Sequence, residues 1–327
     1  MDIEFRSYKT GDSFGIAQLL SKLPYKRDTA YWTWMYRLLN AIDPVISLAV
    51  VKENAGERVV GYTAAAVKTV LFNGESFLCA QGMHAFVDPE FRKYEYIIYE
   101  INSNMHRYCI ARGIKCIFGF PNAAARAYIQ HMHEVAPIGF FKAMEYSYNT
   151  AFTKSTDVLL EENKLDVFDA LHRITILKEE NKGAPVHFNY SSQYYYFRYF
   201  ANPENTYQVK WIIKNYAVAG VVFLKTYTNG NTTFGHLVEY IIHKQLVSYE
   251  EMVQLVITDF EGKVNKLAFW PVEEEFKNCL TKLSFEAAGF DTMFTVRFLD
   301  EDFKEKCAQV LLDFNSWSLQ MGYSDAF

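Results

Sequence analysis

The sequence predicts an α/β (α+β) protein made of two mixed β-sheet domains in tandem. Half of the 327 residues are hydrophobic, which is enough for a large packed core, and the length favours two domains. The strongest local signal is a strand–helix–strand–helix order between Gln81 and Met132, and a weaker copy follows in the second half. We therefore expect domains at residues 1–155 and 187–327, joined by a mostly helical connection at 156–186.

The first copy of this order is bounded by clear breaks. Gln81 to Val87 is apolar and compatible with a strand, and Asp88-Pro89 ends it. Apolar residues then recur at helical spacing from Ile97 to a stop at Gly113, and a second strand follows at 115–120. Pro121-Asn122 turns the chain into an alanine-rich helix. Because first-turn N–H groups of a helix are unpaired, the loop after the first strand is predicted to bind an anion.

The second half repeats several features of the first. Tyr194 to Phe200 echoes the aromatic run Tyr31 to Arg37, and the strand Gly235 to His243 corresponds to Gln81 to Val87. Hairpins and a capping box are also predicted, at Asn73-Gly74, Asn229-Gly230 and Ser248 with Glu251. Two further expectations are that Gly139-Phe140 and the stretch 143–152 close the first sheet and that the stretch 159–182 is mostly helical.

The residues from Val87 to Arg92 and from Gly119 to Asn122 carry a resemblance to a known family. Val87-Asp88-Pro89-Glu90-Phe91-Arg92 resembles the lead-in to the pyrophosphate loop of the GNAT superfamily, the acyl-CoA-dependent N-acyltransferases. Gly119-Phe120-Pro121-Asn122 is similar to a variant of the family motif found in the branch that acts on amino sugars. Where the family has two small residues, this chain has Glu95 and Ile97, so either the loop takes a wider path or CoA binds weakly.

The resemblance implies two GNAT-like domains, the second degenerate, with an acyl-CoA in the first. The expected co-substrate is acetyl-CoA or a short hydroxyacyl-CoA, and no metal is needed. Asn122 is expected to bond the pantetheine arm, to cap its helix, or both. The cofactor-binding residues implied are Ala85, Phe86, Val87, Arg92, Lys93, Tyr94, Glu95, Tyr96, Ile97, Asn122 and Ala125.

The chemistry requires a base for the amine and an acid for the leaving thiolate. His84 is the first candidate base, since a histidine titrates near pH 6.5 in the absence of perturbation; the alternative is a histidine satisfied within the sheet. Glu239, in the equivalent strand of the second copy, is another candidate. Tyr128 is a candidate acid or a packing residue. Asp325 or the carboxylate of Phe327 is a third candidate base, the alternative being an unstructured chain end.

The aromatic run of the first half is expected to line the acceptor pocket through Trp34, Tyr36 and Arg37, the alternative being core packing. The resemblance implies an acceptor amine on a nucleotide-linked amino-deoxy sugar, for example a dTDP-3-amino-3,6-dideoxyhexose in surface polysaccharide synthesis. Arg37, Arg198 or Lys210 would meet its diphosphate. The alternatives are an aminoglycoside, a polyamine, a peptidyl amine, or a non-catalytic ligand-binding module.

Charge and cysteine content argue against several other classes. The net charge is −5 without a long basic run, so nucleic acid is not expected as a partner. Neither a signal peptide nor a membrane-spanning apolar run is visible. The five cysteines form no Cys-x-x-Cys pair and are expected to be free thiols in a cytoplasmic protein, with the oligomeric state left open.

Overall fold

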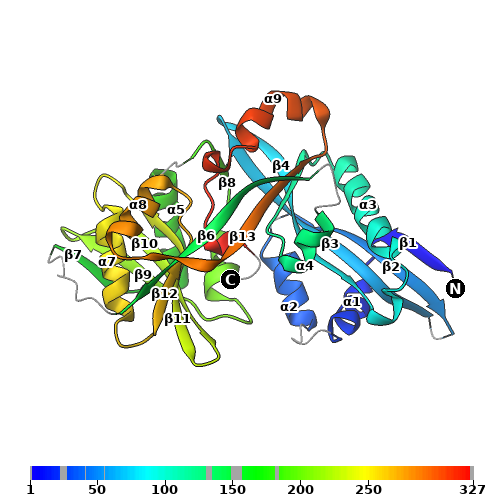
Figure 1. Ribbon diagram of the computed structural model, residues 1–327, viewed down its shortest axis with the longest axis horizontal. Coiled ribbons are helices and arrows are strands. Elements are labelled where there is room, and N and C mark those ends of the chain that lie inside the picture. Colours follow the sequence, from blue (N-terminus) through cyan, green and yellow to red (C-terminus); the bar gives the residue numbers. More distant parts are fainter. Residues whose placement is uncertain are drawn as a thin grey trace. The chain divides into compact units, whose positions relative to one another are not determined.

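The chain folds into two units, each built on a mixed β-sheet. The computed structural model describes residues 2–22, 28–40, 42–54, 56–129, 135–148, 157–180 and 184–324. Unit 1 comprises residues 1–138, 188–194 and 294–313, and unit 2 comprises residues 139–187, 195–293 and 314–327. Each unit is drawn as a ribbon in Figure 1.

The sheet of unit 1 has the order β1-β2-β3-β4-β5, with the last part of β13 beside β5. The pairs from β1 to β4 are antiparallel, β4 and β5 are parallel, and β13 is antiparallel to β5. The strands are β1 (Ile3–Ser7), β2 (Val45–Glu53), β3 (Gly56–Phe72), β4 (Glu75–Val87), β5 (Cys116–Gly119) and β13 (Glu286–Phe298).

One face of this sheet packs against α3 (Tyr96–Ala111), the helix between β4 and β5 (Figure 1). The apolar side chains of α3 are buried against β2, β3 and β4, with Ile97, Ile101 and Cys109 fully buried. Gly61 in β3 makes room for this packing, because Ile97 approaches it closely. The other helices of unit 1 are α1 (Asp12–Leu20), α2 (Thr29–Thr33), η1 (Trp34–Leu38), η2 (Pro89–Phe91), α4 (Ala123–Ile129) and α9 (Glu301–Leu311).

Unit 2 repeats this plan with the order β13-β6-β12-β11-β10-β9-β7. Its helix α7 lies between β11 and the parallel strand β12, as α3 lies between β4 and β5. The elements of unit 2 are β6 (Ala136–Ser147), β7 (Val158–Glu162), α5 (Val167–Glu180), η3 (Tyr196–Phe200), β9 (Gln208–Lys214), β10 (Ala217–Asn229), β11 (Thr232–Ile242), α7 (Tyr249–Phe260), β12 (Lys266–Phe269), α8 (Glu274–Lys282), η4 (Phe314–Ser316) and η5 (Met321–Tyr323). The residues of β8 (Val186–Phe188) and α6 (Ser192–Tyr195) are divided between the two units.

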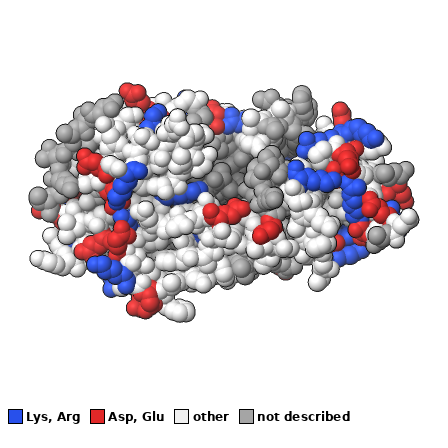
Figure 2. Space-filling view, turned by 90° about the horizontal axis from the view of Figure 1, so that it is seen from below, with Lys and Arg blue, Asp and Glu red and all other residues white. Residues whose placement is uncertain are grey.

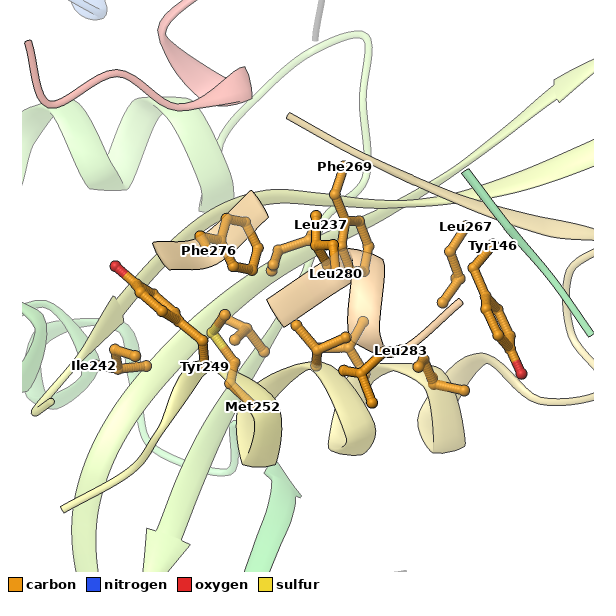
Figure 3. Packing of buried hydrophobic residues seen from close by; sticks show 14 of the residues in the cluster. Tyr146, Leu237, Ile242, Tyr249, Met252, Leu267, Phe269, Phe276, Leu280 and Leu283 are labelled. Carbon is orange, nitrogen blue, oxygen red and sulfur yellow. The ribbon is translucent and has the colours of Figure 1, made fainter. Parts of the chain in front are cut away.

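The core of unit 2 lies between the sheet and the helices α7 and α8. Leu237, Leu267 and Phe269 of the sheet belong to one buried cluster with Met252 of α7 and with Phe276 and Leu280 of α8 (Figure 3). All six side chains are buried. Burial of this much apolar surface is the main force holding the second sheet to its helices.

The two units exchange a strand. The strand that follows α4 is β6, which pairs with β12 of unit 2, whereas β13, which follows α8, pairs with β5 of unit 1. The expectation that the stretch 143–152 closes the first sheet was therefore wrong for its described part. The pairing of β6 and β13 joins residues far apart in the chain, so local sequence patterns do not specify it.

Other local expectations can also be compared with the structure. The hairpin at Asn73-Gly74 is confirmed, with both residues at positive φ, and so is the hairpin at Asn229-Gly230. The capping box of Ser248 and Glu251 is present at the start of α7. The stretch 159–182 was expected to be mostly helical, but it begins within the edge strand β7, which pairs with β9, and α5 starts only at Val167.

The expectation that the cysteines are free thiols can be compared with the structure, and so can the lengths of the helices. All five cysteines are free, and four are buried while Cys279 is half-buried. Cys79 and Cys116 occupy paired positions on β4 and β5, with their sulfur atoms 2.7 Å apart. Within the described ranges, no helix is both long and apolar enough to span a bilayer.

We predict that Gly61→Ala destabilises unit 1. A Cβ atom at Gly61 would lie 3.2 Å from Cγ2 of Ile97 and 3.4 Å from Cβ of Ala49. Such overpacking costs about 1–3 kcal/mol of unfolding free energy, measurable by urea denaturation. Gly289→Ala is the control, because nothing lies within 4 Å of its added Cβ. Equal stability of the Gly61 and Gly289 variants would contradict the packing described.

Candidate functional site

The candidate site in unit 1 begins where β4 and β5 separate. Their parallel pairing runs from Cys79↔Cys116 to Gly82↔Gly119, but β4 continues to Val87 beside β3. The register with β3 shifts there, because Thr63 pairs with Ala85 while Ala65 pairs with Gly82. This is a β-bulge, with one extra residue on β4. Bulges bend a strand and re-aim its side chains, and they are frequent beside functional sites.

Beyond the bulge, the peptide groups of β4 alternate between β3 and the edge that β5 has left. The amide of Asp88 donates to the carbonyl of Val60 at 2.8 Å, so it points toward β3. Alternation then directs the amides of Ala85 and Val87 to the opposite edge, and that of Phe86 toward β3. The strand thus presents main-chain donors at the place where the sequence predicts contacts with an acyl-CoA.

His84 lies in the bulge, and its imidazole is half-buried. Nδ1 of His84 is 2.6 Å from the hydroxyl oxygen of Tyr36, and the rings of Tyr31 and Tyr36 meet the imidazole edge-on. Tyr36 is 1% exposed and Trp34 3% exposed, so both are packed within unit 1. The structure therefore brings Tyr36, a predicted acceptor residue, into contact with His84, a predicted base.

The position of Tyr36 depends on a helix that changes its winding. Asp28 caps α2 by accepting a hydrogen bond from the amide of Tyr31 at 2.9 Å. The chain then enters the π-helical turn η1, in which the amide of Leu39 donates to the carbonyl of Trp34 at 2.9 Å. Such wider turns are rare and often occur at functional sites.

Lys68 and Asn40 also belong to this face of unit 1, although sequence reasoning did not select them. Lys68 is 7% exposed, and its Nζ donates to Oδ1 of Asn40 at 2.5 Å. The ammonium also lies over the rings of Tyr190 and Tyr194, at 5.2 and 5.4 Å from their centroids. The available signal was a single lysine within the apolar strand Val59 to Val70, which indicates a buried cation with dedicated partners.

The loop after β4 is anchored by Asp88, which is 1% exposed. Its carboxylate accepts hydrogen bonds from Nζ of Lys22 and Nη2 of Arg58, each at 2.6 Å, and from the amide of Glu90. Burial alone would raise the pKa of Asp88, but the hydrogen bonds from Lys22 and Arg58 hold it below its usual value. Asp88 therefore stays ionised and fixes the start of the loop.

Several amides of this loop are already used. Those of Phe91, Arg92, Tyr94 and Ile97 donate to main-chain carbonyls within the segment 88–97. The helix α3 starts at Tyr96, and Glu95 at its N-cap makes no capping hydrogen bond with its side chain. Helix geometry leaves the first-turn amides of Tyr96 and Ile98 without an intrahelical acceptor. These amides are the part of the loop suited to an anion.

Ile97 and Glu95, which stand where the resembled family has small residues, differ in burial. Ile97 is fully buried, and its side chain packs against Gly61 inside unit 1. Its bulk is therefore accommodated by the core and does not cover the helix N-terminus. Glu95 is exposed, so its charge lies in water beside the first turn.

The basic and aromatic residues of the loop lie close to one another. Arg92 is exposed, its Nε donates to the carbonyl of Val87 at 3.1 Å, and its guanidinium lies over the ring of Phe86 at 5.3 Å. Nζ of Lys93 is 5.2 Å from the ring centroid of Tyr94, which also meets Tyr96 edge-on. The structure thus gathers the predicted loop residues at the N-terminus of α3.

The turn after β5 forms as a helix cap. Oδ1 of Asn122 accepts a hydrogen bond from the amide of Ala125 at 2.9 Å, which confirms the capping role expected of Asn122. Tyr128 lies in α4, but its side chain and that of Arg37 are outside what the structure describes. Asp325 and Phe327 also lie outside the described residues.

Unit 2 has a related arrangement around Glu239. The register of β11 with β10 shifts between Phe223↔Glu239 and Leu224↔Leu237, which is again a bulge, with the extra residue on β11. Glu239 is fully buried. It accepts hydrogen bonds from the hydroxyl of Tyr195 at 3.0 Å, from that of Tyr199, and from that of Tyr323 at 3.5 Å.

The electrostatics of Glu239 follow from its burial. Burial raises the pKa of Glu239, while the tyrosine hydroxyls and the charges of Lys178 and Arg198 oppose that rise. Burial also lowers the pKa of Lys178 to about 8. Tyr199 comes from η3, a second π-helical turn, in which the amide of Ala201 donates to the carbonyl of Tyr196. Both units therefore place a titratable side chain at a bulge, bonded to tyrosine from an aromatic helical run.

The units differ at the helix that follows the bulged strand. In unit 2 the hydroxyl of Ser248 accepts from the amide of Glu251, and the carboxylate of Glu251 accepts from the amide of Ser248. Oε1 of Glu251 also accepts from Nζ of Lys214 at 2.7 Å. The N-terminus of α7 is therefore occupied by its own side chains, whereas that of α3 has no such cap.

Comparison with known proteins gives the fold. No protein-family model and no curated protein sequence matches the chain. A GCN5-related N-acetyltransferase from Anabaena variabilis is similar in structure, with a TM-score of 0.68 and 11% identity over 92% of this chain and 74% of that chain. So is a probable N-acyltransferase of unknown function from Enterococcus faecalis, with a TM-score of 0.70 and 10% identity over 92% and 73%.

A third similar structure is the N-myristoyltransferase of Saccharomyces cerevisiae with bound myristoyl-CoA, with a TM-score of 0.58 and 10% identity over 90% of this chain and 82% of that one. The chain thus has the mixed-sheet fold of the GCN5-related N-acetyltransferases, as predicted. At these identities the likeness establishes the fold, and the activity depends on the site.

We predict that Asp88→Asn destabilises the protein by about 1–2 kcal/mol at pH 7, because it removes the charge that pairs with Lys22 and Arg58. The folded-state pKa of Asp88 is lowered, so its contribution is present above the pKa of the unfolded chain and is lost as pH falls through the folded value. Urea denaturation should show the difference from wild type shrinking below about pH 4. Glu90→Gln, at an exposed partner of Arg58, is the control. A difference that does not vary with pH would contradict the assignment.

Proposed function

We propose that the protein is an acyl-CoA-dependent N-acyltransferase whose co-substrate binds unit 1. The observation that supports this best is the contrast between the two helices that follow the bulged strands. The N-terminus of α3 lacks a side-chain cap, while that of α7 is closed by Ser248 and Glu251. An uncapped helix N-terminus after a strand and loop suits a diphosphate.

In the proposed complex, the diphosphate of CoA meets the first-turn amides of α3 and the guanidinium of Arg92. The pantetheine arm follows the edge of β4 that β5 leaves after Gly82, with Asn122 beside it. The amide of Ala85 or Val87 donates to the thioester oxygen. A donor of this kind is worth about 3 kcal/mol when negative charge develops on that oxygen.

The reaction forms a C–N bond and breaks the C–S bond of the thioester. The attacking amine gives a proton to Nε2 of His84, and the leaving thiolate takes a proton from an acid, for which Tyr128 remains the candidate. In this proposal Nδ1–H of His84 donates to the hydroxyl oxygen of Tyr36, so the unprotonated nitrogen that accepts the proton is Nε2. Glu239 and Asp325 remain alternative bases in this proposal.

The acceptor we propose is the amine of a nucleotide-linked amino-deoxy sugar, such as a dTDP-3-amino-3,6-dideoxyhexose, used in surface polysaccharide synthesis. The motif from Gly119 to Asn122 supports this choice, whereas Trp34 and Tyr36 are packed in the core and do not. Lys210 is no longer a candidate for its diphosphate, because its Nζ pairs with Glu162 at 2.6 Å and with Asp259 at 2.7 Å.

A cytoplasmic location and a small-molecule acceptor are part of the same proposal. On the face shown in Figure 2, lysine and arginine side chains alternate with acidic ones, and the described residues there form no broad basic area. That pattern does not favour nucleic acid as a partner. Within the described ranges, no group of three or more His, Cys, Asp or Glu side chains could hold a metal ion.

The binding step can be tested by calorimetric titration with CoA. Removing the exposed charge of Glu95 with Glu95→Gln should tighten CoA binding by about two- to fivefold, and Arg92→Gln should weaken it by a similar factor. Glu100→Gln is the matched control, because Glu100 is an exposed acid further along the same helix. If wild type fails to bind CoA, or if all three variants behave alike, the proposed cofactor site is wrong.

The transfer step can be tested by thiol release from acetyl-CoA and hydroxybutyryl-CoA with a panel of nucleotide-linked amino sugars, polyamines and peptides. His84→Gln should lower kcat by about 10²- to 10⁴-fold and leave CoA affinity unchanged. Release with a polyamine or peptide alone would overturn the sugar acceptor. Unaltered turnover in the His84 variant would remove His84 as the base.

A further inference from the structure

A row of polar side chains crosses the sheet of unit 2 on the face opposite α7 and α8. Lys225 of β10 pairs with His236 of β11, and Leu224 pairs with Gln208 at the start of β9. Tyr207, one residue before Gln208, therefore stands at the position opposite Lys225. Residues opposite each other on antiparallel strands share one face, with Cβ atoms about 4.5–5.5 Å apart. The neighbouring Val222 and Leu224 point the other way, into the core under α7.

Two members of this row lack the partners that buried polar groups normally have. Tyr207 is 8% exposed, and its hydroxyl makes no hydrogen bond to any described residue. Lys225 is half-buried, and within the described ranges no hydrogen bond or ion pair engages its ammonium. A buried hydroxyl or ammonium without a partner costs free energy, so such groups in one place indicate a ligand.

A second cation lies beside the row. Arg198 of η3 is 2% exposed, and its Nη2 donates to the carbonyl of Ser324 at 3.1 Å. Burial lowers the pKa of Lys225, and the charge of Arg198 lowers it further. Burial raises the pKa of Tyr207, and Arg198 opposes that rise, so the guanidinium acts on both groups. The exposed Glu204 carboxylate also acts on both.

The other residues of the row add no net charge. His236 is buried, and its pKa is lowered to about 4, first by burial and then by Lys225, so the imidazole is neutral at pH 7. Its Nδ1 is 3.3 Å from the sulfur of Met321. The ring of Tyr199 packs edge-on against Tyr207 and is stacked on Phe223, which holds the phenol in place.

We propose that Lys225, Tyr207 and Arg198 bind a phosphate group of a small molecule. Lys225 supplies an ammonium, Tyr207 a hydroxyl donor and Arg198 a second positive charge, on one side of the sheet. A tetrahedral phosphate has enough oxygens to accept from donors that approach from different strands. The site belongs to unit 2 alone and does not depend on acyl transfer. If the acceptor of the proposed reaction is nucleotide-linked, which rests on the proposed function, its diphosphate has the chemistry that this site would bind.

The test is calorimetric titration of the full chain with pyrophosphate. The titrations use the Arg92→Gln background, so that binding to the α3 loop is weakened. Lys225→Gln should weaken pyrophosphate binding about tenfold, because it removes a hydrogen bond to a charged group. Tyr207→Phe should weaken it less, and Glu204→Gln should strengthen it. Lys142→Gln is the matched control, since Lys142 is an exposed lysine of the same unit.

The stability of the variants without anion gives a second readout. The Tyr207 hydroxyl makes no hydrogen bond within the described part of the chain, so Tyr207→Phe should keep or raise the thermal midpoint in anion-free buffer. A fall in that midpoint would show an internal role for the hydroxyl and overturn the site. Equal weakening by Lys225→Gln and Lys142→Gln would also overturn it, as would acetate binding as tightly as pyrophosphate at equal ionic strength. Loss of CoA binding with pyrophosphate binding retained would refute the proposed function alone.

Discussion

The candidate site of unit 1 depends on the point where the parallel pairing of β4 and β5 ends. Up to Gly82 and Gly119 the strands bond to each other, and beyond them β4 carries a bulge and, among the described strands, pairs with β3 alone. An unpaired strand edge normally invites another strand. Here it lies between the bulge that carries His84 and the uncapped start of α3. The end of one hydrogen-bonded ladder therefore supplies main-chain donors, a titratable side chain and a helix N-terminus in one short segment.

Unit 2 shows how the same scaffold can be changed for another task. Its strand β11 has a bulge too, and Tyr199 from the π-helical turn η3 donates a hydrogen bond to Glu239 there. However, Glu239 is fully buried and the N-terminus of α7 is capped by Ser248 and Glu251, so a diphosphate is not expected to bind at that helix terminus. Its polar features lie on the other face of the sheet, in the row that contains Lys225. Two copies of one architecture thus differ in which groups are left for a ligand.

The fold class and the local signals could be predicted from the sequence because they depend on neighbouring residues. Asn73-Gly74 specifies its turn through positive φ, and Ser248 with Glu251 specifies a cap through contacts within one helical turn. The exchange of β6 and β13 could not be predicted, since their pairing joins residues far apart in the chain. The strand β7 was not predicted, because Leu160, Glu161 and Glu162 fit the pattern of a charged helix. Their pairing with β9 shows that they belong to a strand.

The site could be predicted only in part, because the sequence does not show in which direction each side chain points. The sequence placed Ile97 in the loop, where it looked like an obstacle to a phosphate, but the side chain is buried against Gly61. Tyr36 was assigned to the acceptor, and it bonds to His84. In the sequence, Lys68 and Lys225 are only lysines within predicted strands, which is a weak signal. Their roles depend on which side chains the fold places beside each ammonium group.

The most direct test of the central claim is amide hydrogen exchange measured with and without CoA. The account predicts slower exchange of the amides from Lys93 to Ile98 and of Ala85 and Val87 when CoA is bound, with no change from Val247 to Glu251. Protection at the start of α7, or none at the start of α3 at saturating CoA, would contradict it.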